Sequence, residues 1–285
     1  MSLLISRRRN VIMKAVITAG GLGTRLLPTT KEIPKELLPL YSRGENGEIL
    51  VKPVLQLIFE IMYKEGVREF CIVTGRGKRA VEDHFTPDWD FVEYLEKIGK
   101  GSQAKELGRF FAMIEDSTIF WVKQPQPRGF GHAVYMAKAF VGDENFLLAA
   151  GDTVVYPEDF LRRLLQGGSD AALLLAEVED PRAYGVAVLN GDRVVKVVEK
   201  PREPPSRMAI LPFYVLPAEI MNVLEKAEAG IGGEVQLTDA IQKLIERGRD
   251  VRAIVLDDRY EFADVGTPES YIKALEMTFS RSRGA

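Results

Sequence analysis

The sequence contains little cysteine and histidine, and none of its hydrophobic runs is long. Cys71 is the one cysteine among 285 residues, which excludes an internal disulfide bond. It lies in an apolar segment, residues 69–73, so we expect a buried thiol and a reducing, cytoplasmic setting. His84 and His132 share no metal-ligand spacing, and we expect both to be structural. No apolar run approaches the roughly 18 residues of a membrane helix, so we expect no membrane contact.

The chain also lacks an excess of positive charge. Its 38 Lys and Arg residues are outnumbered by 41 Asp and Glu residues, and the net charge is −3. A nucleic-acid-binding protein normally presents a basic surface, so we expect no nucleic acid partner. Residues 1–12 include Arg7-Arg8-Arg9 but neither an apolar core nor a small-residue cleavage site. We therefore predict an N-terminal tail with solvated arginines rather than a signal peptide.

Strand-like and helix-like segments alternate along residues 13–285, which predicts a single α/β domain. Near-continuous apolar strands between amphipathic segments are typical of a mostly parallel sheet with helices on both faces. The predicted strands are residues 14–18, 68–74, 118–122, 145–149, 171–178, 185–189, 194–199, 208–216 and 251–256. The predicted helices are residues 54–64, 78–84, 131–139, 157–165, 217–227, 236–246 and 268–279. We also predict an inserted charged helix over residues 88–105 and a loop over residues 42–48.

The segment from Ala19 to Leu40, AGGLGTRLLPTTKEIPKELLPL, is a glycine loop after the first strand. Leu26 stands where the dinucleotide-binding motif needs its third glycine, and no Walker Gly-Lys-Ser/Thr occurs, so both familiar phosphate loops are excluded. The glycines still let backbone N–H groups approach a phosphate, and Arg25 and Lys35 add positive charge. The alternative is a plain strand-to-helix turn, which has no need of so much charge.

Three further polar side chains follow apolar segments. Asp152 follows an apolar strand, where a carboxylate points to the usual ligand crevice of a parallel sheet, and Asp264 lies in a later glycine turn. Two such carboxylates suit Mg²⁺, although Asp152 alone is equally typical of a helix cap or turn. Gln124 can pair with the edge that uracil and thymine present, or, with its amide reversed, with cytosine. On residue types alone, the segment from Gln124 is equally typical of a surface loop.

The loop and its lysine-rich continuation resemble the signature of the sugar-1-phosphate nucleotidylyltransferases, and most closely that of the bacterial uridylyltransferases of this family. The resemblance covers nearly the whole chain and implies a Rossmann-like, mostly parallel mixed sheet of the nucleotide-diphospho-sugar transferase type. It implies uridylyl transfer from UTP to α-D-glucose 1-phosphate, with Mg²⁺ as cofactor and a homodimer or homotetramer as the assembly.

The resemblance also assigns roles to individual residues. The implied nucleotide-binding residues are Ala19, Gly20, Gly21, Gly23, Thr24, Gln124 and Gly129. The implied sugar-phosphate-binding residues are Tyr184, Gly185, Glu199 and Lys200, in motifs reading Tyr-Gly-Val and Glu-Lys-Pro. The implied catalytic cations are Arg25, Lys35 and Lys200, and the implied metal ligands are Asp152 and Asp264.

Several alternatives stay open at the level of sequence. A dTTP-dependent enzyme would differ by one methyl group on the base. Pro212 stands where the family has glycine in a strand beside the sugar, so a relaxed choice of sugar 1-phosphate is a second alternative. A non-catalytic nucleotide-sugar-binding regulator is a third, disfavoured by the intact Arg25, Lys35 and Asp152. An NAD-dependent oxidoreductase is disfavoured by Leu26.

Overall fold

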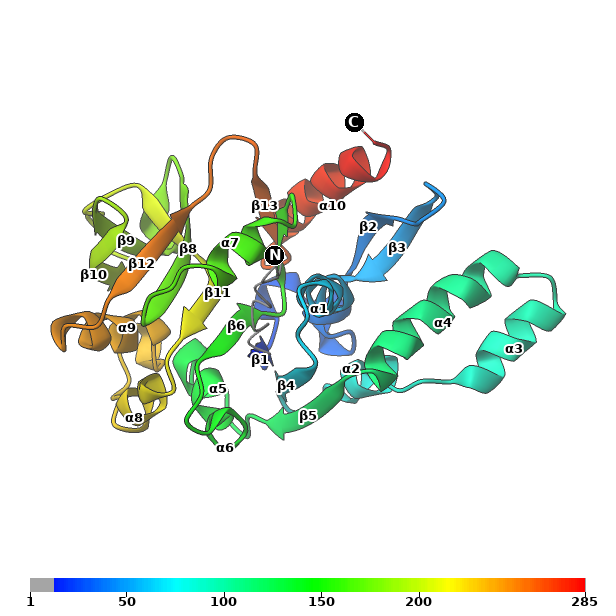
Figure 1. Cartoon of the computed structure of the whole chain (residues 1–285), viewed down its shortest axis with the longest axis horizontal. Helices are drawn as coiled ribbons and strands as arrows, with labels where there is room; N and C mark the ends of the chain where they lie inside the picture. The colour runs from blue at the N-terminus through cyan, green and yellow to red at the C-terminus, as the bar shows by residue number, and fades with distance from the viewer. Residues whose placement is uncertain (1–12, 285) are drawn as a thin grey trace, which may run out of the picture.

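The computed structural model describes residues 13–284 (Figure 1). The predicted tail, residues 1–12 with its three arginines, lies outside the described residues. One nine-stranded sheet runs through the molecule in the order β5-β4-β1-β6-β11-β8-β12-β10-β9. Its strands are β1 Lys14–Ala19, β4 Glu69–Thr74, β5 Thr118–Lys123, β6 Phe146–Ala150, β8 Ala171–Glu177, β9 Gly185–Asn190, β10 Arg193–Glu199, β11 Met208–Leu216 and β12 Val251–Val255.

The sheet is mixed but mostly parallel, as predicted. β5, β4, β1 and β6 pair in parallel, and so do β8 and β12. Only β11 and β10 run against the other strands of this sheet. Two small antiparallel sheets lie outside it, one pairing β2 Pro39–Arg43 with β3 Ile49–Pro53 and one pairing β7 Thr153–Tyr156 with β13 Glu261–Asp264.

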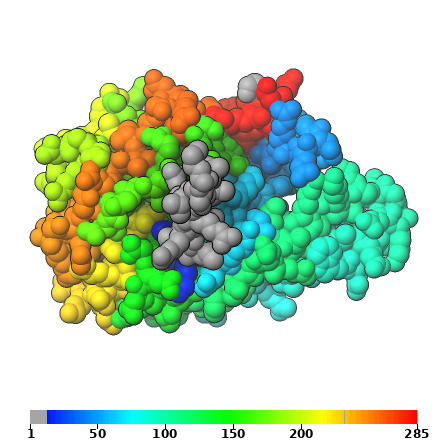
Figure 2. All heavy atoms as spheres, viewed as in Figure 1, coloured from blue at the N-terminus to red at the C-terminus, as the bar shows by residue number. Residues whose placement is uncertain are grey.

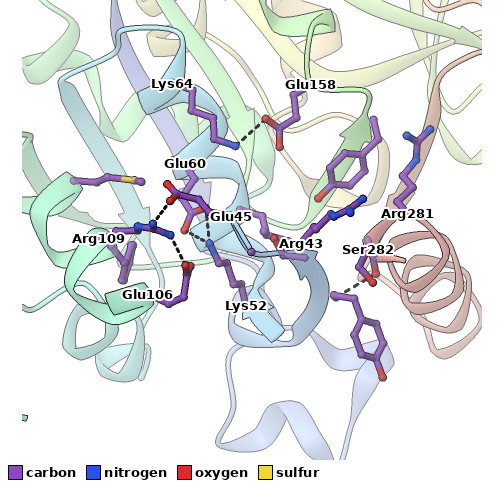
Figure 3. Close-up of a pocket in the computed structure, with 18 of the residues that line it drawn as sticks. Arg43, Glu45, Lys52, Glu60, Lys64, Glu106, Arg109, Glu158, Arg281 and Ser282 are labelled. Carbon is purple, nitrogen blue, oxygen red and sulfur yellow. Dashed lines mark hydrogen bonds and ion pairs between the residues drawn. The ribbon is translucent and has the colours of Figure 1, made fainter. Parts of the chain in front are cut away.

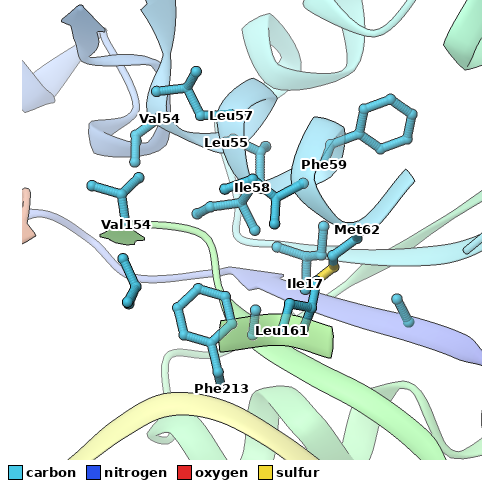
Figure 4. Close-up of a cluster of buried hydrophobic side chains, with 14 of the residues drawn as sticks. Ile17, Val54, Leu55, Leu57, Ile58, Phe59, Met62, Val154, Leu161 and Phe213 are labelled. Carbon is cyan, nitrogen blue, oxygen red and sulfur yellow. The ribbon is translucent and has the colours of Figure 1, made fainter. Parts of the chain in front are cut away.

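Helices cover both faces of the sheet, and each face has its own hydrophobic core. Along β1, Ile17 faces the core formed with α1, α4 and α7, whereas its neighbour Val16 faces the core formed with α5, α8 and α9. Figure 4 shows part of the first core, in which Ile17 lies among side chains of α1. The helices are α1 Val54–Lys64, α2 Arg79–His84, α3 Trp89–Lys97, α4 Gly101–Glu115, α5 Phe130–Met136, α6 Lys138–Val141, α7 Phe160–Leu165, α8 Glu219–Glu225, α9 Leu237–Glu246 and α10 Pro268–Ser282. Among residues 13–284, no helix combines the length and apolar character needed to cross a bilayer.

Two sequence predictions are wrong in detail. Residues 88–105 do not form one helix, because Gly99 adopts a left-handed φ of 78° and separates α3 from α4. These two helices pack as an arm that projects from the body of the molecule (Figure 2). Residues 42–48 are not simply a loop, because Ser42 and Arg43 belong to strand β2 and only the tip of the β2–β3 hairpin is irregular.

The carboxyl ends of the central strands meet at one edge of the sheet. Ala19 at the end of β1 pairs with Thr74 at the end of β4, and Thr18 pairs with Ala150 at the end of β6. The glycine loop, the turn before α2 and the turn that carries Asp152 therefore leave the sheet side by side. This edge is where ligands bind in open α/β sheets.

Candidate active site

A cavity of about 380 Å³ lies at this edge of the sheet. Most of the predicted nucleotide-site residues line it, together with side chains that the sequence did not single out. The lining includes Gly20, Gly21, Gly23, Thr24, Arg25, Lys35, Glu36, Gln124, Gly129, Asp152, Glu234 and Gly266. Ala19 is the buried last residue of β1, directly before this loop.

The glycine loop is shaped by close contacts rather than by its sequence spacing alone. A Cβ at Gly20 would lie 2.3 Å from Oε1 of Gln124, so a side chain there would collide. Gly23 has a left-handed φ of 67°, and its carbonyl accepts a hydrogen bond of 2.7 Å from the Thr30 hydroxyl. The loop thus needs glycine at Gly20 for space and at Gly23 for conformation.

Lys35 and Asp152 form an ion pair inside the cavity, although the chain separates them by 117 residues. Burial would lower the pKa of the Lys35 ammonium, but the carboxylates of Asp152 and Glu36 outweigh it, and the pKa of Lys35 is raised. Burial likewise opposes ionisation of Asp152, yet the ammonium of Lys35 leaves the pKa of this carboxyl below its ordinary value. Each group therefore keeps the other charged within the site.

A second buried pair, Glu36 with Lys78, lies beside the first and was not predicted. Nζ of Lys78 donates to both carboxylate oxygens of Glu36 at 2.7 Å. Burial raises the pKa of Glu36 and lowers that of Lys78, so each charge depends on its partner. The sequence shows Glu36 only as part of the lysine-rich motif. No nearby residue indicates its partner Lys78, which is 42 residues away.

Gln124 is held in one orientation by its own loop. Its amide nitrogen donates to the Gly129 carbonyl at 3.1 Å and contacts Nδ1 of His132 at 3.1 Å. A carbonyl can only accept, so the amide nitrogen must face Gly129, and Oε1 is left on the side of Gly20. The free group of Gln124 is thus an acceptor, which suits a base with an N–H at this edge.

Gly129 begins helix α5 and lies against a second segment of chain. Its φ of 98° favours glycine, and a Cβ there would lie 2.7 Å from Cβ of Glu234. The neighbouring backbone is fixed by a hydrogen bond of 2.8 Å from the Val235 amide to the Arg128 carbonyl. Glu234 therefore lies beside the proposed base loop. His132 keeps a structural role here, and burial, with the nearby Arg128, lowers its pKa.

Of the two predicted metal ligands, Asp152 lies in the turn before β7 and Asp264 is the last residue of β13. Asp264 pairs with Thr153, the residue after Asp152, and the Val265 amide donates to the Asp152 carbonyl at 2.9 Å. Oδ1 of Asp264 accepts from the Gly266 amide at 2.7 Å and from the Ser270 hydroxyl at 2.8 Å. Asp152 lines the cavity, and Asp264 does not line it but accepts from Gly266, which does. Two such carboxylates fit Mg²⁺, which takes one or two protein carboxylates and completes its shell with water and substrate oxygens. Residues 13–284 contain no cluster of three or more His, Cys, Asp or Glu side chains suited to a metal ion, so a metal site built from protein ligands alone is not found there.

The predicted sugar-phosphate residues gather in one cluster, but they do not line the 380 Å³ cavity. Glu199 accepts a hydrogen bond of 2.6 Å from Thr238, and a Cβ at Gly185 would come within 3.2 Å of the Glu199 carboxylate. Lys200 has a left-handed φ of 38°, and its amide donates to the Tyr184 carbonyl at 3.0 Å. Burial, and secondly the charge of Asp264, raises the pKa of Tyr184.

A larger cavity, about 470 Å³, lies elsewhere, between the β2–β3 hairpin, α4 and the end of α10 (Figure 3). It contains none of the predicted site residues, and its acidic side chains already have cationic partners. The pairs are Lys52 with Glu60, Lys64 with Glu158, and Arg109 with Glu45 and Glu106. This cavity is therefore not the site of the predicted chemistry.

Known proteins resemble this chain over most of its length. The family model described as nucleotidyl transferase matches residues 14–280. The chain is 39% identical over 248 residues to a UTP–glucose-1-phosphate uridylyltransferase of Bacillus subtilis (strain 168), covering 82% of this chain and 81% of the relative. It is 37% identical over 275 residues to an enzyme of that name from Staphylococcus epidermidis (strain RP62A), covering 92% and 90% respectively.

Solved structures are similar over almost the full length. A UDP-glucose pyrophosphorylase complexed with UDP-glucose superposes with a TM-score of 0.79 at 28% identity, covering 95% of this chain and 99% of that one. A UTP-bound UDP-glucose pyrophosphorylase (UGPase) from Acinetobacter baumannii gives 0.77 at 28% identity, covering 95% and 98%. The predicted α/β fold class is thereby confirmed.

Proposed function

We propose that this chain, which belongs to the nucleotidyl transferase family, transfers a uridylyl group from UTP to α-D-glucose 1-phosphate. The products are UDP-glucose and pyrophosphate. One observation supports this most: the glycine loop, the Lys35–Asp152 pair and the oriented Gln124 converge on one cavity. The curated relatives at 39% and 37% identity carry the name of this activity.

The base class follows from the orientation of Gln124. Because the amide nitrogen of Gln124 donates to the Gly129 carbonyl, the oxygen Oε1 is left to accept a hydrogen bond from the base. Uracil and thymine present an N–H at the edge that pairs, whereas cytosine presents an acceptor. This favours UTP or dTTP over CTP, and the names of the relatives favour UTP over dTTP.

The reaction needs positioning and charge stabilisation rather than a covalent intermediate. An oxygen of the sugar phosphate attacks the α-phosphorus of UTP, and the bond from that phosphorus to the pyrophosphate oxygen breaks. The sugar phosphate is largely ionised at neutral pH, because its second pKa is about 6. No general base is then required.

The residues have distinct parts in this scheme. Backbone N–H groups of the glycine loop and the side chains of Arg25 and Lys35 hold the triphosphate and its growing negative charge. Glu199 accepts hydrogen bonds from sugar hydroxyls, and Lys200 neutralises the sugar phosphate. Asp152 and Asp264 would hold Mg²⁺, which supplies Lewis-acid stabilisation of the phosphate oxygens when bound.

The test is pyrophosphate release over a matrix of UTP, dTTP, CTP and ATP with glucose, galactose and mannose 1-phosphates. We expect UTP with glucose 1-phosphate to give the highest kcat/KM. A chain that binds nucleotide without releasing pyrophosphate from any pair would instead be a non-catalytic regulator. A homodimer or homotetramer, and a cytoplasmic setting, remain predictions; light scattering checks the first.

A further inference from the structure

The Glu36–Lys78 pair is the most deeply buried ion pair found among residues 13–284. The Glu36 side chain is 1% exposed and that of Lys78 is 8% exposed. Burying two charges costs desolvation that their attraction often does not repay, and apolar replacements of such pairs are often neutral or stabilising. Stability alone therefore gives a weak reason for this pair, and its surroundings give a stronger one.

The pair lies directly beside the proposed catalytic lysine. Lys35 and Glu36 are consecutive in a 3-10 turn, and both line the 380 Å³ cavity. Lys78 is the N-cap residue of α2, after the turn that follows β4, and its Nζ reaches Glu36. Two ion pairs, Lys78 with Glu36 and Lys35 with Asp152, are thus joined through the consecutive residues Lys35 and Glu36.

We propose that Lys78 is a positioning residue for the transfer reaction: by occupying both carboxylate oxygens of Glu36, it keeps Lys35 available to the triphosphate. This inference rests on the proposed function. Lys35 is paired with Asp152. When Asp152 instead serves a metal ion, Lys35 loses this partner, and Glu36 is the neighbouring carboxylate. Because Lys78 already holds Glu36 with two hydrogen bonds of 2.7 Å, Lys35 is left to turn to the phosphates.

The first variant is Lys78→Met, which keeps the length of the side chain and removes its charge. Glu36 then loses both hydrogen bonds and turns to Lys35. We expect kcat/KM for UTP to fall at least about tenfold, a factor that equals 1.4 kcal/mol, and we expect the Kd of UTP, measured calorimetrically without sugar phosphate, to rise in parallel.

The second variant, Glu36→Gln combined with Lys78→Met, separates positioning from mere structural support. It removes the carboxylate that competes for Lys35, so we expect kcat/KM for UTP to return to within about threefold of wild type. A pair that only stabilises the fold would leave the double variant as impaired as Lys78→Met or worse.

Lys52→Met is the matched control. Lys52 also donates to both oxygens of a largely buried glutamate, Glu60, at 2.9 Å, but this pair lies at the other cavity. We expect its kcat/KM for UTP to stay within about twofold of wild type. Circular dichroism and thermal unfolding show whether each variant is folded.

Each outcome decides the inference. A folded Lys78→Met variant with wild-type kcat/KM and Kd for UTP overturns it, and so does a double variant that shows no recovery. If Lys78→Met does not fold, the double variant decides by comparison with wild type: a loss beyond about tenfold overturns the inference. If the wild-type chain releases no pyrophosphate, the proposed function fails, while the UTP Kd series still tests whether Lys78 positions Lys35.

Discussion

Gly20 has no room for a side chain, because a Cβ there would lie 2.3 Å from Oε1 of Gln124. Its φ is not in the left-handed region, so Gly20→Ala should leave the backbone unstrained and displace the Gln124 amide. We expect KM for UTP to rise at least about tenfold, or ~1.4 kcal/mol, and the preference for UTP over CTP to shrink. Gly101→Ala, in helix α4, is the control, since a Cβ there would have nothing within 4 Å and the residue does not line the nucleotide cavity. Equal kinetics for the two variants would show that Gln124 does not read the base.

Asp152 is the residue on which the metal proposal depends most. Asp152→Asn keeps the shape, removes the charge and leaves Lys35 without its buried partner. We expect Mg²⁺-dependent pyrophosphate release to fall at least about a hundredfold, or ~2.7 kcal/mol of barrier, with no recovery at higher Mg²⁺. Asp180→Asn is the control, because that carboxylate pairs with Arg182 on the surface. Unaltered Mg²⁺ dependence in Asp152→Asn would place the metal elsewhere.

At the scale of single residues, the sequence indicated the site residues that follow a strand or lie near one. Arg25, Lys35 and Asp152 directly follow or lie near strands, and the structure brings all three to one cavity. Lys78 could not be predicted, because its role depends on Glu36, 42 residues away, and a lysine in a turn is ordinary.

At the scale of elements, Pro212 marks an irregularity in strand β11. The register of β11 against β8 shifts between Leu211 and Tyr214, so Pro212 lies at a bulge where its missing N–H costs no ladder hydrogen bond. Pro212 does not line the nucleotide cavity. Ile210, two residues before it, lies close to Gly185, where a Cβ would come within 3.3 Å of Cδ1 of Ile210. The bulge therefore belongs to the strand beside the proposed sugar cluster.

Pro212 should influence which sugar 1-phosphate is accepted. We expect wild type to use at least one sugar besides glucose, with kcat/KM values within about a hundredfold, or ~3 kcal/mol. Pro212→Gly restores an N–H and removes the ring, so it should narrow the range toward glucose, at a cost near 1 kcal/mol in stability. Steady-state kinetics with glucose, galactose and mannose 1-phosphates check this. Strict use of glucose by both proteins would show that position 212 does not affect the sugar.

The elements that the sequence predicted well are rich in apolar residues. The strands β1, β4 and β6 are buried on both faces, and α1 is buried all round from Val54 to Met62. The predicted single helix over residues 88–105 is wrong because Gly99, with its left-handed φ, ends α3, and a charged pattern alone does not indicate this break. The β2–β3 hairpin was missed because its strands are short and half-exposed, so neither carries a clear alternation.

At the scale of the whole molecule, the two hydrophobic cores share one sheet. Ile17 and Val16 are consecutive in β1, yet they belong to opposite cores. The strands β1, β4 and β6 are buried on both faces, so the two cores meet across these strands. We propose on this ground that residues 13–285 form one domain that unfolds in one step.

Unfolding followed by two probes tests this proposal. Trp89 and Trp121 are the only tryptophans, and both contact aromatic side chains of the core formed with α1, namely Phe111 and Phe85. Leu148 is fully buried in the opposite core. Leu148→Ala should cost about 2–5 kcal/mol and lower the midpoint of thermal unfolding by at least about 4 °C. Because the sheet couples the two cores, the transitions followed by tryptophan fluorescence and by far-ultraviolet circular dichroism should shift by the same amount.

Phe59→Ala, in the core near the tryptophans, should likewise shift both transitions together. A fluorescence transition that stays at its wild-type midpoint in Leu148→Ala, while circular dichroism shifts, would divide the chain into two independently unfolding units.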